Sequence, residues 1–113
     1  MKLVILAATL LLVFTGCSSS READVKHAGV SPGGTRIDLD VGTCNNRLSS
    51  RVEETDQEVR VLVTARGSTS NDCADSHTII LSEPLGDRLL IDEFDGEPVD
   101  VSLNENIPDP IGR

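Results

Sequence analysis

The sequence has few aromatic residues: two phenylalanines, and no tyrosine or tryptophan. Proteins that bind single-stranded nucleic acid stack the bases on aromatic side chains, so this scarcity argues against such a function. Positive charge is also scarce, with 10 Lys and Arg against 19 Asp and Glu. Because phosphate binding needs clustered basic residues, the negative balance argues further against nucleic acid. It also argues against docking on an anionic lipid surface.

Groups for catalysis are few. Asp75, Ser76 and His77 are the residue types of a catalytic triad, but neighbours on a strand point to opposite faces. We therefore do not expect Ser76 and His77 to form a hydrogen bond. The sequence has no Gly-x-Ser-x-Gly elbow, no Cys-x-x-Cys pair and no Cys/His cluster at zinc spacing. We predict that the chain is not an enzyme, and we assign no catalytic residue, no metal site and no cofactor.

The longest apolar run, residues 3–14, is too short to span a membrane, which takes about 20 residues. It follows Lys2 and precedes the segment Phe14-Thr15-Gly16-Cys17, as the apolar core of a secretion signal precedes a cleavage site of small residues. This arrangement resembles the lipobox of bacterial lipoproteins. The resemblance implies that residues 1–16 are a signal peptide, cleaved before Cys17, and that the Cys17 sulfur carries a lipid with acyl chains such as palmitate.

The same resemblance implies an extracytoplasmic protein that is anchored to the membrane through its lipid. Two or three acyl chains anchor firmly, because each buried CH₂ contributes about 0.8 kcal/mol. In an organism with two membranes, Ser18 after the cysteine resembles the default signal for the outer membrane. The segments EPLGDR (residues 83–88), Ile91-Asp92 and GEPV (residues 96–99) are loosely similar to small uncharacterised secreted proteins of actinobacteria, where the anchor would stay in the plasma membrane.

Three cysteines are present. Assignment of Cys17 to the lipid leaves Cys44 and Cys73, an even pair in an oxidising compartment. We predict a structural disulfide between them. It closes a loop of about 30 residues, for which the chain-entropy model gives roughly 3–4 kcal/mol of stabilisation.

Removal of residues 1–16 leaves 97 residues, enough for one small domain. Of the charged residues only Lys2 is lost, so 9 basic and 19 acidic residues remain and the net charge becomes −10. Residues 17–34 are predicted to form a flexible lipidated tether, which as a coil spans roughly 20–25 Å. Residues 35–104 are expected to form a β-domain, and residues 105–113 a flexible C-terminal tail.

From Thr35 onward the apolar residues recur with a period of two, which predicts strands. Six strands are expected, at residues 35–41, 48–52, 58–65, 76–81, 88–92 and 99–103. We expect the second and third to form a hairpin in which Val52 faces Val61 and Glu53 faces Arg60, because this register pairs opposite charges. The pattern predicts an all-β fold, a small antiparallel β-sandwich or barrel.

Phe94 is the only aromatic residue after the signal peptide and falls at an expected hairpin tip next to Asp95-Gly96. We expect its ring to fold back onto the core. If the ring is exposed instead, Phe94 becomes a contact for a partner.

Charged side chains offer two further candidate sites. Residues 92–97 are rich in oxygen ligands, but Phe94 occupies the second ligand position of a calcium loop, so calcium binding is only an alternative. Three arginines, Arg51, Arg60 and Arg66, are expected to pair with Glu53, Glu54 and Glu58; the other interpretation is an anion site on one sheet face.

These features predict a membrane-anchored extracytoplasmic module that binds an envelope protein or supports an envelope system. The alternative is a β-domain that binds a small ligand or calcium. A protease inhibitor acting through the loop at residues 67–72, or a small hydrolase, agrees less well with the sequence.

Overall fold

The computed structural model describes residues 19–111, so the predictions for the signal peptide and for Cys17 lie outside the described residues. Within this range the chain forms strands and no helix, which confirms the all-β prediction. The described range therefore contains no helix of the length and apolar character that a membrane crossing requires. The strands are β1 (Ser20–Ala23), β2 (Val25–Val30), β3 (Arg36–Val41), β4 (Arg47–Glu54), β5 (Glu58–Arg66), β6 (Asp75–Ile80), β7 (Leu89–Asp92), β8 (Glu97–Pro98) and β9 (Val101–Leu103).

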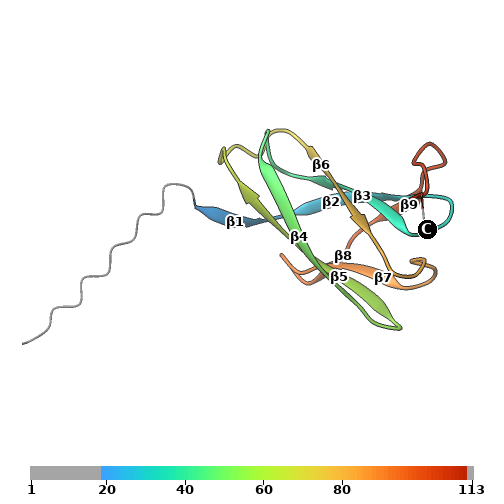
Figure 1. Ribbon diagram of the computed structural model, residues 1–113. Helices are drawn as coiled ribbons and strands as arrows, with labels where there is room; N and C mark the ends of the chain where they lie inside the picture. The colour runs from blue at the N-terminus through green and yellow to red at the C-terminus, as the bar shows by residue number, and fades with distance from the viewer. Residues whose placement is uncertain (1–18, 112–113) are drawn as a thin grey trace, which may run out of the picture.

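The first sheet is built around β5 (Figure 1). β4 pairs with it antiparallel along its length, in the predicted register of Val52 with Val61 and Glu53 with Arg60. The other edge of β5 is shared by two strands. β1 pairs antiparallel with residues 63–66, and β7 pairs parallel with residues 58–61. β8 then follows β7 as the last strand of this sheet.

The second sheet has the order β6-β3-β2-β9, with β9 parallel to β2. The two sheets enclose one apolar core. Alternate residues of β3 and β5 are fully buried in it, as their period of two predicts. The buried members from these two strands are Ile37, Leu39, Val41, Val59, Val61, Val63 and Ala65.

The tether predicted for residues 17–34 is wrong for most of its length, because β1 and β2 begin at Ser20 and Val25 and belong to the two sheets. Ala28 is fully buried, and Ala23 and Val25 are buried as well. These strands cover the open edges of β5 and β3. Their polar residues face outward, and pairing with β5 and β3 overrides their weak local preference for strand.

The C-terminal tail predicted for residues 105–113 is also partly wrong. Ile107 is buried, and its amide donates to the carbonyl of Asn104. The amide of Gly33 donates to Oδ1 of Asp109 at 2.8 Å. Residues 104–109 therefore fold back against the loop between β2 and β3.

The sixth predicted strand divides into β8 and β9, which belong to different sheets. The chain crosses between the sheets at Val99 and Asp100. The Val99 amide donates to Leu90 of the first sheet, and the carbonyl of Asp100 accepts from Ala28 of the second. The two parallel pairings, β5 with β7 and β2 with β9, correct the prediction of a purely antiparallel fold.

Candidate functional site

An apolar groove of about 360 Å³ lies where the chain crosses from one sheet to the other. Its size falls within the range of ligand sites in proteins, roughly 300–1,000 Å³. Two leucines at its rim are unusually exposed: Leu89 of β7 at 54% and Leu103 of β9 at 61%. The lining residues are Val30, Ser31, Pro32, Gly34, Leu85, Gly86, Arg88, Leu89, Leu90, Val99, Val101 and Leu103.

One wall of the groove is the strand β9, which ends the second sheet. On the side opposite β2, β9 has no strand partner among residues 19–111. An unpaired strand edge offers backbone donors and acceptors to an added strand. The groove therefore combines an apolar floor with a free strand edge.

Arg88 forms the polar end of the groove. Its guanidinium donates to the carbonyls of Glu83 and Pro84 at 2.9 Å each, and it forms an ion pair with Glu54 at 3.3 Å. The side chains of Arg88 and Glu54 are mostly buried, with 14% and 20% of their surfaces exposed. These contacts tie the loop before β7 to the hairpin of β4 and β5, and so fix the shape of the groove on this side.

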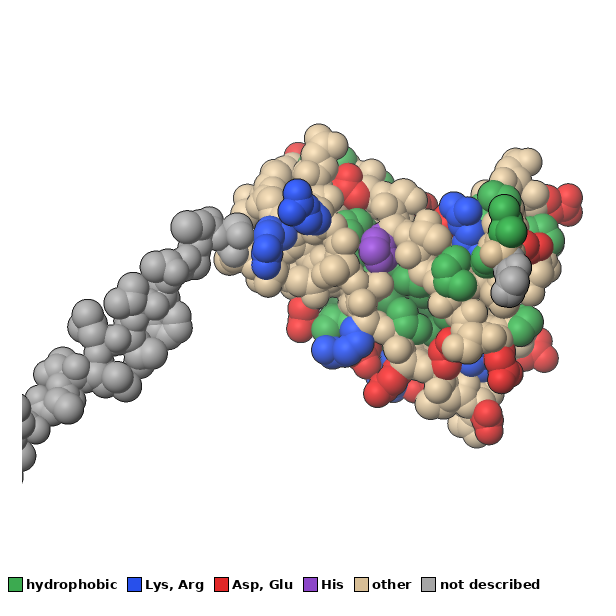
Figure 2. Space-filling model, in the orientation of Figure 1, with side chains coloured by type: hydrophobic (Ala, Val, Ile, Leu, Met, Phe, Trp, Pro, Cys, Tyr) green, Lys and Arg blue, Asp and Glu red, His purple; other side chains and the backbone are tan. Residues whose placement is uncertain are grey.

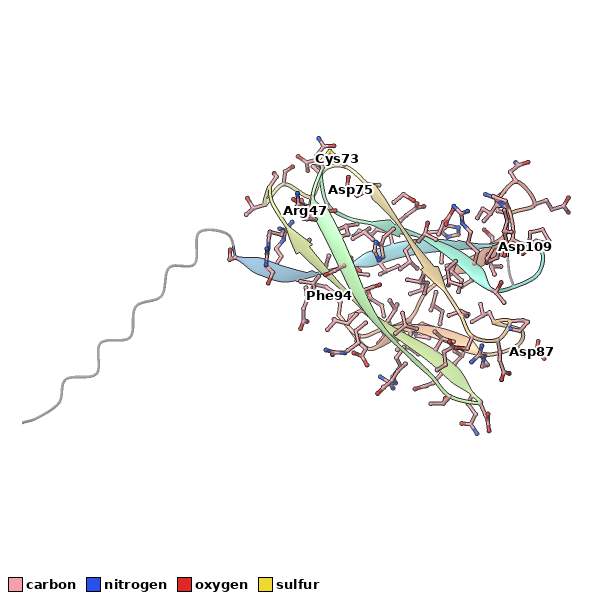
Figure 3. The ribbon with its side chains drawn as sticks, in the orientation of Figure 1. Arg47, Cys73, Asp75, Asp87, Phe94 and Asp109 are labelled. Carbon is pink, nitrogen blue, oxygen red and sulfur yellow. A yellow bond between two sulfur atoms is a disulfide. The ribbon has the colours of Figure 1, made fainter. Side chains whose placement is uncertain are left out.

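Phe94 lies in the turn between β7 and β8 and is 46% exposed (Figure 3). The expectation that its ring folds back onto the core is therefore wrong. The Phe94 amide donates to Oδ1 of Asp92, which sets the turn, and Gly96 completes it with φ of 74°. Phe94 is not among the residues that line the groove, so the structure separates this sequence candidate from the apolar site.

Three carboxylates, from Asp24, Asp92 and Asp95, come within 4.8 Å of one another. Burial raises the pKa of Asp92, with a smaller contribution from the charges of Asp95 and Asp24, while amide hydrogen bonds oppose the shift. Each carboxylate already has a partner on this chain. Asp24 binds Lys26 at 2.8 Å, Asp92 accepts from the amide of Val25 at 2.9 Å, and Asp95 accepts from the Glu97 amide. Asp92 and Asp95 thus help to set the turn after β7, whereas Asp24 lies between β1 and β2.

The predicted disulfide joins Cys44 and Cys73 and is confirmed. It links the loop after β3 to the loop before β6. The carboxylate of Asp75 strengthens the same link, accepting from Thr43 Oγ1 at 2.6 Å and from the amides of Asn45 and Asn46 at 2.9 Å each. Asn45 has a left-handed backbone, with φ of 56°. This end of the domain is thus fixed by one covalent and three hydrogen-bonded contacts.

We expect Asp75→Asn to destabilise the protein more at neutral pH than in acid. The hydrogen bond from Thr43, with those from Asn46 and Asn45, outweighs burial and lowers the pKa of Asp75. Its carboxylate therefore stabilises the fold above about pH 4, and this contribution is lost as the pH falls through the lowered folded pKa.

Melting curves of both proteins between neutral pH and about pH 2 measure this effect. The difference in Tm is expected to shrink on acidification. The matched control is Asp72→Asn in the loop just before β6, which should change little. A difference for Asp75→Asn that is constant with pH would contradict the assignment.

His77 of β6 bonds to Ser50 of β4 at 2.9 Å between Nε2 and Oγ. Ser76, its sequence neighbour, is exposed and does not share this contact. Burial lowers the pKa of His77, so its ring is neutral at physiological pH. The bond joins β4 at the edge of the first sheet to β6 at the edge of the second.

The predicted arginine pairs are confirmed only in part. Arg60 pairs with Glu58 as expected, whereas Arg51 pairs with Glu93 at 3.8 Å. Arg66 forms no ion pair with any residue from 19 to 111.

No family model, curated protein or solved structure matches this chain. The groove was not predicted from the sequence, because its walls come from strands far apart in the chain. Leu89 and Leu103 gave a partial signal, since each stands in an apolar strand pattern, but the pattern alone indicates a core position for both.

Proposed function

We propose that the chain is an extracytoplasmic lipoprotein, anchored through Cys17, whose β-domain binds an envelope protein in the apolar groove. The observation that carries this proposal is the exposure of Leu89 and Leu103 beside the groove and the free edge of β9. Exposed apolar groups gathered at one concave place are typical of interaction surfaces. The disulfide is consistent with an oxidising compartment.

The partner would supply an extended apolar segment. Such a segment adds to a strand edge through main-chain hydrogen bonds, and its alternate side chains fill the neighbouring pocket. Here β9 supplies the edge and the leucines of the groove supply the pocket. With only three residues in β9, the strand gives few hydrogen bonds, so most of the affinity would come from apolar contact.

A photo-crosslinking amino acid at position 103, in intact cells, tests this proposal. We expect one dominant covalent adduct with a protein. The matched control is the same group at Ile80 of β6, which is exposed to a similar degree, 55% against 61% for Leu103, but does not line the groove. When the photo-crosslinking amino acid is placed at another groove position, Leu103→Asp is expected to reduce the yield of the protein adduct at least tenfold, because it places a charge in an apolar contact. Cys17→Ala, which removes the anchor, should also abolish the adduct.

Equal labelling at positions 103 and 80 would reject the groove as the binding surface. A protein adduct that persists in Cys17→Ala would reject the need for the anchor.

The second candidate function is binding of a small apolar ligand, favoured by the groove volume of about 360 Å³. Mass spectrometry of the purified protein under native conditions would then find a bound small molecule, which Leu103→Asp releases.

A further inference from the structure

The domain begins much closer to Cys17 than the predicted tether of residues 17–34 implies. β1 starts at Ser20, three residues after Cys17. Three residues span at most about 10 Å even when fully extended. If Cys17 carries the anchor, as proposed above, the end of the domain that contains Ser20 is held within about one Debye length of the lipid headgroups.

Two arginines stand beside Ser20 at this end. Ser20 pairs with Arg66 of β5, and Arg66 pairs in turn with Arg47 of β4. Paired residues on antiparallel strands point to the same face. The three residues accordingly line one shallow hollow of about 270 Å³, together with Leu48, Ser49 and Thr64. Figure 2 shows basic side chains gathered where the chain enters the domain, and Figure 3 places Arg47 there.

The arrangement of these arginines is costly within the domain itself. Like charges directly opposite each other on neighbouring strands destabilise a sheet. Neither Arg47 nor Arg66 forms an ion pair with residues 19–111, although this chain has almost twice as many acidic as basic residues. Glu22 lies two residues after Ser20 on β1, on the same face, and is exposed. It is nevertheless not an ion-pair partner of either arginine. Both arginines are exposed, so they are available to an external anion.

We propose that Arg47 and Arg66 bind the phosphates of anionic phospholipids in the membrane that holds the anchor. Guanidinium groups bind phosphate through paired hydrogen bonds. The Cys17 anchor, on which this proposal depends, keeps the headgroups within reach. In this orientation the end of the domain that contains β1 faces the membrane. The groove lies away from β1 and stays open to a partner.

The net charge of −10 argues against docking of the domain as a whole on an anionic surface, but it does not prevent a local contact at this end. Charges farther than about 8 Å from the surface are screened at physiological ionic strength. Glu58 begins β5 and Arg66 ends it, so they are separated by about 26 Å along the strand. The acidic residues at the far end of the domain therefore repel the membrane weakly, whereas the two arginines face it directly.

The test uses the mature chain, residues 17–113, coupled through Cys17 to a maleimide lipid. Cys17 is the only free thiol, because Cys44 and Cys73 are bonded. Vesicles are made of phosphatidylcholine alone or of an equimolar mixture with phosphatidylglycerol. Phenylglyoxal modification of each arginine is followed by mass spectrometry. We expect Arg47 and Arg66 to react about fivefold more slowly on the anionic vesicles, the effect of about 1 kcal/mol per basic residue at such a surface.

Arg51 provides an internal control, because it lies on the same strand as Arg47 but pairs with Glu93. Its reactivity should be the same on both vesicles, and high salt should remove the protection of the other two. Equal reactivity of Arg47 and Arg66 on the two vesicle types would overturn the proposal. So would equal protection by free inorganic phosphate without vesicles.

A second measurement uses the absence of tryptophan from the chain. Ser49→Trp places a single fluorophore in the hollow beside Arg47. Brominated phosphatidylglycerol should quench it in the otherwise unchanged protein and with Arg51→Gln, but not with Arg47→Gln and Arg66→Gln together. Quenching that survives the double change would overturn the proposal. The mass of the protein extracted from cell membranes tests acylation of Cys17 separately, so failure of the anchor and failure of the basic surface are distinguishable.

Discussion

Replacing Cys44 and Cys73 together with alanine is expected to lower Tm by on the order of 20 °C. The disulfide closes a loop with a sequence separation of 29 residues, for which the chain-entropy model gives about 3–4 kcal/mol. In a domain of this size each kcal/mol corresponds to roughly 4–8 °C in Tm. The effect is large because small domains have little other stability to lose.

The reducing agent provides the control for this prediction. Reduction of the unchanged protein should lower its Tm by a similar amount, whereas the double variant should not respond. A fall in Tm of less than about 5 °C would show that the loop is already constrained in the unfolded chain. Asp75 joins the same two loops, so Asp75→Asn should cost more in the double variant than in the unchanged protein.

Part of the fold could be predicted because it depends on local patterns. The hairpin of β4 and β5 was predicted with its register, since alternation and the pairing of Glu53 with Arg60 favour the same alignment. The disulfide followed from the cysteine count once Cys17 was assigned to the lipid. Both features require only neighbours in sequence or a count of residues.

The features that could not be predicted depend on contacts between distant segments. β1 and β2 are short and contain charged residues and small apolar ones such as Ala23 and Ala28. Their strand structure comes from pairing with β5 and β3. The crossing of Val99 and Asp100 between the sheets likewise has no local pattern, because each residue bonds to a different distant strand. The groove and the basic end of the domain both result from these two features.

Replacing Arg88 with alanine is expected to cost about 2–4 kcal/mol of stability and to open the groove. Hydrogen bonds to a charged group contribute roughly 1.5–3 kcal/mol, and loss of one partner leaves the other charge buried. Here Glu54 would keep the hydrogen bond from the Ser82 amide at 2.7 Å but lose its cationic partner. The carbonyls of Thr55, Glu83, Pro84 and Leu85 would all lose their guanidinium donor.

Arg88→Lys should recover less than half of this loss, because an ammonium group has three donors and does not reproduce the planar fork that reaches several acceptors. The matched control is Arg36→Ala. Arg36 also forms an ion pair, but within its own strand with Asp38 at 3.1 Å, so its loss should cost less than about 1 kcal/mol. Urea unfolding of the four proteins measures these differences. Equal costs for Arg88→Ala and Arg36→Ala would contradict a bridging role for Arg88.

The pH dependence separates this bridge from simple packing by the Arg88 side chain. Burial alone would raise the pKa of Glu54, but hydrogen bonds from Ser82 and Arg88 outweigh it and the net pKa is lowered. The bridge therefore stabilises the fold above about pH 4 and is lost as the pH falls through the lowered folded pKa. The cost of Arg88→Ala should shrink on acidification if the bridge is responsible, and stay constant if only packing is lost. Arg88 forms part of the groove wall, and the ionised Glu54 holds it in place. Protonation of Glu54 in acid should therefore also release the partner or ligand from the groove.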